Sequence, residues 1–278
     1  MVRRNDRQYG DITPEEFLRQ MYPQANEIVR NGQLDIATAK CAALAAIATY
    51  VPDAITAFGF GSAFNNRHRP YSDVDVVVFV QESSSMVNYC FMSEGVAVDL
   101  HVVGLDRVDN VIARARKEGI CSILSAVSEG VLLLDTADEG PLLRKRMTEA
   151  MVMQPLPTMD QERRMLRWMI TSQLLDLSQD RPTLQVQAAA LTAYAMLIRL
   201  YYSVSGGWRD RGKWTIGFGE ERHLLLMDLV EGYAVLFSKG EKGAYLRAAL
   251  RILDLDGGPL CLGQGNRLTF DSELADCR

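Results

Sequence analysis

The spacing of hydrophobic residues changes along the chain and predicts two parts with different architectures. Up to about residue 154, segments with the period of a helix alternate with short, valine-rich segments typical of strands. Beyond the Pro155-Leu156-Pro157 break, apolar residues recur almost throughout at spacings of three and four. We therefore predict an α/β domain over residues 1–154 and an α-helical domain over residues 155–278.

The first part contains predicted strands between predicted helices. Thr13 and Pro14 mark a helix start, with threonine as the N-cap and proline in the first helical turn. Residues 120–127 are apolar, but their pattern does not decide between helix and strand. The pattern predicts helices over residues 13–29, 34–50, 107–117 and 139–153, and strands over residues 54–60, 73–80, 95–103 and 131–134.

The second part is predicted to consist of amphipathic helices. A loop rich in glycine and tryptophan, SGGWRDRGKWTIGFG, separates the middle two of them. The predicted helices cover residues 160–179, 183–204, 220–239 and 242–253.

Composition narrows the class of protein. The hydrophobic share is 48% and the charged share 23%, and no apolar run approaches the roughly 18 residues that span a bilayer. Two arginines near the start have no apolar segment behind them, so we expect no secretory signal. The five cysteines form no C-x-x-C pair, which argues against a disulfide framework or a zinc site. We expect a cytoplasmic protein with reduced thiols and no membrane partner.

The charge balance bears on the partner. The formal net charge is −5 and the isoelectric point is about 5.4. Nucleic-acid binders usually carry a basic balance, because phosphate contacts dominate their affinity. This chain therefore favours a small molecule or a protein as its partner, although local basic clusters leave a nucleic acid open.

Two aspartates begin the most valine-rich predicted strand. Asp73 and Asp75 are two residues apart, so on a strand they share one face while the valines between and after them face the core. Carboxylates about 6–7 Å apart along a strand repel each other and resist burial. A bound divalent cation removes both penalties, and Mg²⁺ favours one or two carboxylates together with substrate phosphates.

A third acid and a small-residue turn accompany this pair. Asp99 is isolated in the apolar segment VAVDLHVV, on the next predicted strand, and would complete a site for two metal ions. His101, two residues later, would share its face. Gly61 and Ser62 follow the preceding strand, and a turn of this kind brings backbone N–H groups close to a phosphate, at a helix start that Ser62 would cap.

Each of these features alone is commonly structural, since Asp-x-Asp occurs on solvated strand ends and Gly-Ser in ordinary turns. In this order, with strand patterns before and after, they favour a site that binds a metal–nucleoside triphosphate. Three carboxylates and an anion-binding turn suit attack on the α-phosphorus of that nucleotide.

This arrangement resembles the DNA polymerase β-like nucleotidyltransferase superfamily. The resemblance rests on Gly-Ser, a loop of about ten residues, Ser-Asp-Val-Asp at the head of a valine strand, and an acid in the next strand. With the helical part behind it, the chain is similar to the small-molecule branch that includes the aminoglycoside nucleotidyltransferases. The resemblance implies an α+β protein with a mixed β-sheet flanked by helices, followed by an α-helical bundle.

The resemblance also implies roles for individual residues. Asp73, Asp75 and Asp99 would be catalytic residues and ligands of Mg²⁺, with two ions expected. Gly61, Ser62 and Ser72 would bind the triphosphate. Lys213, in the tryptophan-bearing loop, would place a charge near the triphosphate, and Tyr245 resembles a tyrosine that closes on the nucleotide in relatives.

One part of the motif departs from the family. Many members have an arginine and a glycine soon after Gly-Ser, whereas this loop reads AFNNRHRPY, with Arg67 and Arg69 displaced along it. A role for either arginine at the triphosphate therefore does not transfer from the family.

The function predicted from these features is Mg²⁺-dependent nucleotidyl transfer, with AMP from ATP as the leading case, to a hydroxyl of a small molecule. Pyrophosphate would be released. Two alternatives remain at this point: transfer to a protein or an RNA, and a nucleotide-binding module without turnover. The acceptor, the preferred base, the general base, the oligomeric state and the physiological role do not follow from the sequence.

Overall fold

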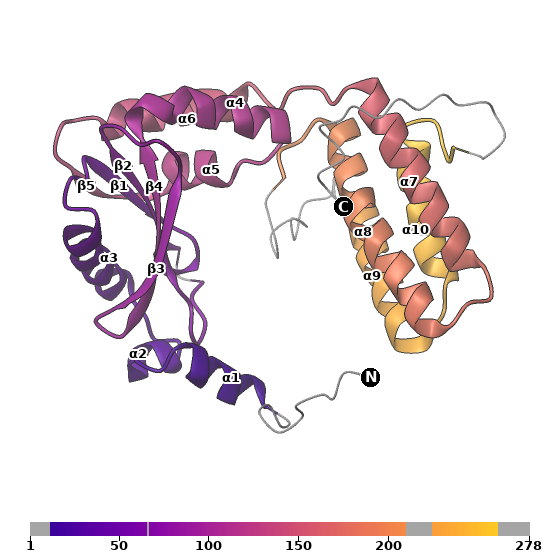
Figure 1. Cartoon of the computed structure of the whole chain (residues 1–278), viewed down its shortest axis with the longest axis horizontal. Helices are drawn as coiled ribbons and strands as arrows, with labels where there is room; N and C mark the ends of the chain where they lie inside the picture. The colour runs from indigo at the N-terminus through magenta and orange to yellow at the C-terminus, as the bar shows by residue number, and fades with distance from the viewer. Residues whose placement is uncertain (1–11, 66, 210–223, 261–278) are drawn as a thin grey trace. The chain divides into compact units, whose positions relative to one another are not determined.

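The computed structural model of the protein describes residues 12–65, 67–209 and 224–260 (Figure 1). The chain divides into two compact units: Met1–Arg114 with Ser122–Met153, and Ala115–Cys121 with Gln154–Arg278. The first holds a five-stranded mixed sheet with helices, and the second is helical. The predicted α+β fold class is thus confirmed. Among the described helices, none combines the length and the apolar character needed to cross a bilayer.

The sheet has the strand order β3-β4-β2-β1-β5. Strands β2 and β4 are parallel neighbours, and the other neighbouring pairs are antiparallel. This parallel pair lies in the interior of the sheet. Because side chains alternate between the two faces along a strand, residues that are register partners on β2 and β4 project from the same face. The strands are β1 (Thr56–Phe60), β2 (Val74–Val80), β3 (Val87–Ser93), β4 (Val96–Gly104) and β5 (Val131–Asp135).

Helices cover both faces of this sheet (Figure 1). The alanine-rich α3 (Ile36–Tyr50) packs on one face, where it meets the alternate valines of β2, from Val74 to Val80. Helix α5 (Ser122–Glu129) contacts β1 and β2 and packs against α6 (Gly140–Val152). Arg144 of α6 lies over the ring of Phe58 of β1, with 5.3 Å from the guanidinium carbon to the ring centroid.

The N-terminal helix is shorter than its sequence pattern predicts. Thr13 forms a capping box with Glu16 at the start of α1 (Pro14–Met21), as expected from the Thr-Pro pair. The predicted continuation to residue 29 is wrong, because the helix ends before Pro23 and a separate α2 (Glu27–Arg30) follows. Proline cannot donate the backbone hydrogen bond that a continuous helix requires.

Strand β3 is the element that the sequence pattern did not reveal. Its residues, VNYCFMS, lie at the edge of the sheet and are partly or fully exposed, so apolar and polar side chains do not alternate cleanly along it. The undecided segment 120–127 becomes most of α5. Helix α4 (Val108–Glu118) follows β4 nearly where a helix was predicted.

The second unit is built from α7 (Asp160–Ser178), α8 (Thr183–Ser205), α9 (Leu224–Lys239) and α10 (Gly243–Asp254). Their apolar faces form one buried cluster that includes Leu197, Tyr245 and Ile252. Helix–helix burial of this kind is what the spacings of three and four predicted.

Candidate functional site

A glycine turn lies directly against one of the predicted catalytic acids. Gly61 follows β1 with φ +76° and ψ −160°, a backbone conformation that essentially only glycine adopts. A Cβ atom at this position would lie 2.4 Å from Oδ2 of Asp75. Glycine therefore allows the turn to approach the Asp75 carboxylate closely.

The parallel pairing of β2 and β4 brings two acids and a histidine together. Asp75 and Asp99 are register partners, and His101 lies two residues further along β4 on the same face. One ligand atom from each of the three side chains lies within 4.8 Å of those from the other two. Val98 and Leu100, on the opposite face, are buried. We call Asp75, Asp99 and His101 the acidic cluster.

Strand β3 adds two polar side chains to the cluster. Cys90 is the register partner of Asp99, and its thiol donates a hydrogen bond to Asp99 Oδ1 at 3.2 Å. Asn88 is the register partner of His101, with 3.0 Å between Asn88 Oδ1 and His101 Nδ1. No sequence pattern pointed to either residue, since their positions depend on an edge strand whose alternation is irregular.

Asp73 lies just before β2 and outside this cluster. The structure groups Asp75 with Asp99 and His101, whereas Asp73 precedes the first strand residue, Val74. The charge of Asp73 nevertheless affects Cys90, which is hydrogen-bonded to Asp99. The pKa of Cys90 is raised first by burial, then by the hydrogen bond to Asp99, and then by the charges of Asp99, Asp73 and Asp75. A metal role for Asp73 stays a prediction.

The two serines of the motif lie beside each other. The Ser62 hydroxyl donates to the Ser72 hydroxyl at 3.4 Å, and Ser72 Oγ accepts a hydrogen bond from the Arg69 backbone N–H at 2.8 Å. The expected helix capped by Ser62 does not form, because Ser62–Phe64 is a single 3₁₀ turn with Gly61 at its N-cap and no side-chain cap bond. A helix dipole therefore adds little at this turn.

Tyr245 lies in the core of the helical unit. Its side chain is 0% exposed, and its hydroxyl donates to the Ala190 carbonyl at 2.8 Å. Burial, followed by the neighbouring Tyr233 and Tyr194, raises its pKa. A side chain in this position packs α10 against α8, and this placement gives no support to the predicted contact with a nucleotide. Lys213 lies outside the described residues.

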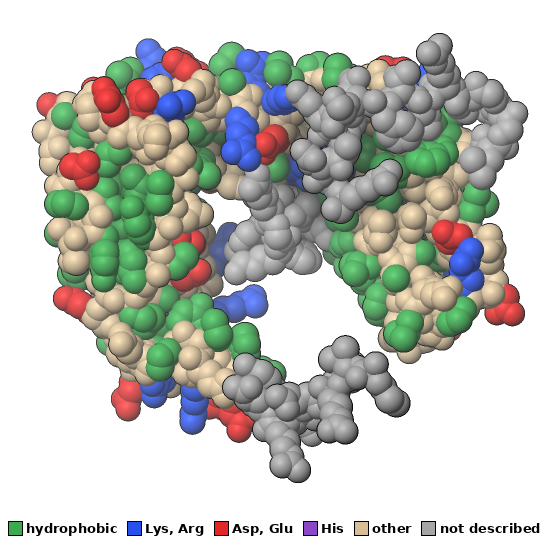
Figure 2. All heavy atoms as spheres, viewed as in Figure 1, with side chains coloured by type: hydrophobic (Ala, Val, Ile, Leu, Met, Phe, Trp, Pro, Cys, Tyr) green, Lys and Arg blue, Asp and Glu red, His purple; other side chains and the backbone are tan. Residues whose placement is uncertain are grey.

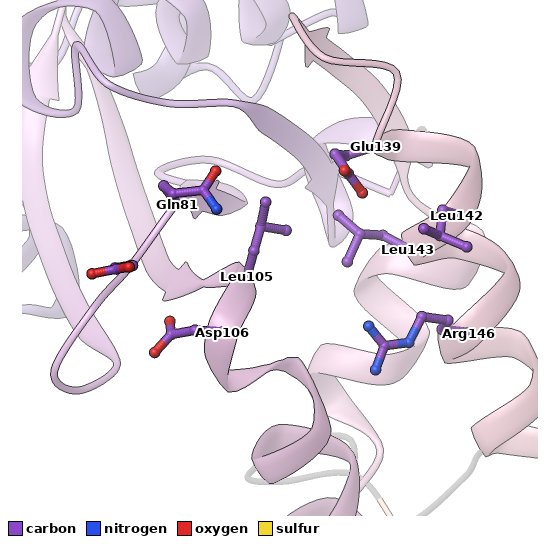
Figure 3. Close-up of a pocket in the computed structure, with 8 residues that line it drawn as sticks. Gln81, Leu105, Asp106, Glu139, Leu142, Leu143 and Arg146 are labelled. Carbon is purple, nitrogen blue, oxygen red and sulfur yellow. The ribbon is translucent and has the colours of Figure 1, made fainter.

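Two of the hollows among the described residues are lined by residues other than those of the acidic cluster. The first, of about 320 Å³, has Gln81 and Asp106 on one side and Glu139 and Arg146 on the other (Figure 3). Gln81 follows the far end of β2 and is thus roughly 20 Å along the strand from Asp75. The first hollow is therefore not part of the cluster.

The second hollow, of about 750 Å³, belongs to the helical unit. Ion pairs line its wall: Arg163 Nε lies 3.0 Å from Asp256 Oδ1, and Arg199 pairs with Glu162. Its volume falls in the range of about 300–1,000 Å³ that small-molecule sites occupy.

Replacing Gly61 with alanine should disturb both the fold and the acidic cluster. We expect a loss of about 1–3 kcal/mol in unfolding free energy from the strained backbone, and a displaced Asp75 carboxylate because of the Cβ clash. Urea unfolding would measure the first effect, and titration with Mg²⁺, the ion that the sequence predicts at these acids, would measure the second. Gly206→Ala is the control, because Gly206 also has positive φ (+71°) but nothing within 4 Å of an added Cβ. Equal Mg²⁺ affinity in the Gly61 variant and the native protein would contradict the close approach to Asp75.

Comparisons with known proteins found a distant structural similarity. No family model matches the sequence, and no curated protein matches it. Among solved structures, the chain is similar to a nucleotidyltransferase-like protein from Exiguobacterium sibiricum 255-15. The identity is 15% and the TM-score 0.38, over 78% of this chain and 74% of that one. A likeness this distant carries no information on the chemistry of the chain.

Proposed function

We propose that the protein is a Mg²⁺-dependent nucleotidyltransferase of the DNA polymerase β-like type. It would transfer a nucleoside monophosphate, with AMP from ATP as the leading case, to a hydroxyl of a small molecule and release pyrophosphate. One observation supports this above the others: Asp75 and Asp99 are partners on adjacent parallel strands, beside a turn that only glycine allows.

The side chains present fit a divalent cation. Asp75 and Asp99 offer carboxylate oxygens, the donors that Mg²⁺ prefers, and their ligand atoms lie within 4.8 Å of each other. Without a cation, two acids so close would repel each other on a partly buried face. Asp73 is a further carboxylate of the same region. When bound, the ion would neutralise charge on the triphosphate and polarise the α-phosphoryl group.

The residues of the chain would divide the remaining work. The turn at Gly61 and the hydroxyls of Ser62 and Ser72 would hold the triphosphate. Asp99 is our candidate to take the proton from the acceptor hydroxyl. The acceptor oxygen would then form a bond to the α-phosphorus while the bond to the bridging β-phosphate oxygen breaks, so that pyrophosphate leaves with that electron pair.

The distribution of charge supports a small acceptor rather than a nucleic acid. On the face drawn in Figure 2, basic and acidic side chains of the described residues are interspersed instead of being separated by sign. The net charge of −5 points the same way. We also propose that residues 1–154 form the catalytic domain and that residues 155–278 serve substrate binding. The hollow of about 750 Å³, which residues 155–278 form together with residues 117–120 of the same unit, is of suitable size.

The test is to incubate the full chain with Mg²⁺ and each of four α-labelled nucleoside triphosphates, ATP, GTP, CTP and UTP, together with fractionated cell extract. We expect pyrophosphate release and label in the small-molecule fraction. Label on a protein or an RNA would overturn the acceptor class but keep the chemistry. Tight binding of Mg-nucleotide without any pyrophosphate release would overturn the enzyme and favour a binding module.

A further inference from the structure

His101 lies beside the two acids of the cluster in an orientation that suits a metal ligand. Its Nε2 atom is 3.7 Å from Asp99 Oδ2, and the side chains of His101 and Asp99 are 22% and 26% exposed. We propose that His101 binds the metal ion through Nε2 and gives this site a higher affinity for first-row transition ions than for Mg²⁺, with Mn²⁺ as the probe that measures it. This inference rests on the metal site of the proposed function and adds to it the identity of a nitrogen ligand and its positioning residue.

Asn88 fixes the ring in the orientation that ligation needs. An amide oxygen can only accept a hydrogen bond, so with Asn88 Oδ1 at 3.0 Å, the Nδ1 atom of His101 carries the hydrogen. In the neutral ring, the lone pair then belongs to Nε2, on the side of Asp99. Metal-ligating histidines almost always donate their other N–H to an oxygen in this way.

The surrounding backbone and side chains restrict the ring further. Asn88 and His101 are opposite each other in the antiparallel β3–β4 pair, so strand pairing itself sets their approach. The ring of Phe60 lies close by as well, with its centroid 6.0 Å from that of His101 and the two planes tilted by 40°. Less rotational freedom is therefore lost when the imidazole binds an ion.

The donor set separates the candidate ions. Mg²⁺ takes oxygen ligands almost exclusively, whereas imidazole suits first-row transition ions. Two carboxylates and one imidazole, with ligand atoms within 4.8 Å of one another, form a mixed set. Mn²⁺ accepts carboxylate oxygens as Mg²⁺ does and also accepts the nitrogen, so of these two ions the histidine adds affinity for Mn²⁺.

The experiment measures metal binding directly, without nucleotide. The full chain is titrated with MnCl₂ while the electron paramagnetic resonance signal of free Mn²⁺ is followed, and MgCl₂ is then used as a competitor. We expect His101→Gln to lower Mn²⁺ affinity by about 10–100-fold while changing Mg²⁺ affinity by less than about threefold. A variant that changes both affinities equally, or neither, would overturn the proposal.

Three further variants separate ligation from a structural effect. Asn88→Leu removes the acceptor and should lower the ratio of Mn²⁺ to Mg²⁺ affinity by about 10-fold, whereas Asn88→Asp keeps an acceptor and should preserve that ratio. Equal ratios in these two variants would overturn the positioning role. His68→Gln, at the other histidine in the described part of the chain, should leave both affinities unchanged. Circular dichroism verifies that each variant folds.

The metal-binding result for His101 and the test of the proposed function can fail independently of each other. Loss of Mn²⁺ preference in His101→Gln, in a protein that releases no pyrophosphate, would support the ligand and reject the transferase. Pyrophosphate release with an unchanged metal preference in the same variant would do the reverse.

Discussion

Replacing Asp75 with asparagine should lower the rate of pyrophosphate release by about 10²–10⁴-fold, which corresponds to the several kcal/mol of charge stabilisation that a metal site supplies in the transition state. Asparagine has nearly the same shape but lacks the charge that would hold the ion beside the Gly61 turn. The measurement is a steady-state assay of pyrophosphate release with saturating nucleotide and the acceptor fraction that takes the label.

Asp53→Asn is the matched control for this prediction. Asp53 is an exposed acid on the turn before β1, at the opposite end of that strand from Gly61, so its neutralisation should leave the rate unchanged. Full activity in the Asp75 variant would reject the paired-carboxylate site, and with it the function proposed for the chain.

Replacing Tyr245 with alanine should destabilise the helical unit by about 3–5 kcal/mol, because a large and fully buried ring would leave a cavity between α8 and α10. Tyr245→Phe should cost about 1–3 kcal/mol, since it removes only the hydroxyl that donates to Ala190. Urea unfolding followed by far-ultraviolet circular dichroism, to which the helices contribute most, would measure both losses.

Leu250→Ala, on the same helix and 42% exposed, is the control and should change the unfolding free energy by no more than about 0.5 kcal/mol. The Tyr245 variants also distinguish a role in core packing from the predicted contact with a nucleotide. A nucleotide contact would raise KM for the nucleotide in Tyr245→Phe and leave the unfolding midpoint unchanged, which is the opposite of the result that core packing predicts.

The sequence predicted the parts of the fold that local periodicity determines. The valine run of β2 and the spacings of three and four in α7 to α10 express burial along a single element, so one segment is enough to recognise each. The positions of Asp75 and Asp99 could also be proposed, because each acid interrupts an apolar strand. That these two acids would be partners across a parallel pair depended on strand order, which no single segment contains.

The features that were missed depend on contacts between distant segments. Asn88 and Cys90 became part of the cluster through the pairing of β3 with β4, and β3 is an edge strand with little buried surface to impose a pattern. The nucleotide contact of Tyr245, predicted from its resemblance to a residue of relatives, is a different case and stays a prediction. The burial of Tyr245 between helices α8 and α10 reflects packing that the helical period alone does not assign to one side chain.

The polar side chains that β3 places beside the acidic cluster depend on the register in which this edge strand pairs with β4. Asn88 and Cys90 face His101 and Asp99 because they are two residues apart on one side of the strand, while Tyr89 between them faces the other way. A slip of β3 by a single residue would exchange these faces and place a phenol where an amide and a thiol now lie. Sequence changes in the short segment 81–86, which leads into β3, would therefore alter the metal preference proposed for the cluster without replacing any of the proposed ligands.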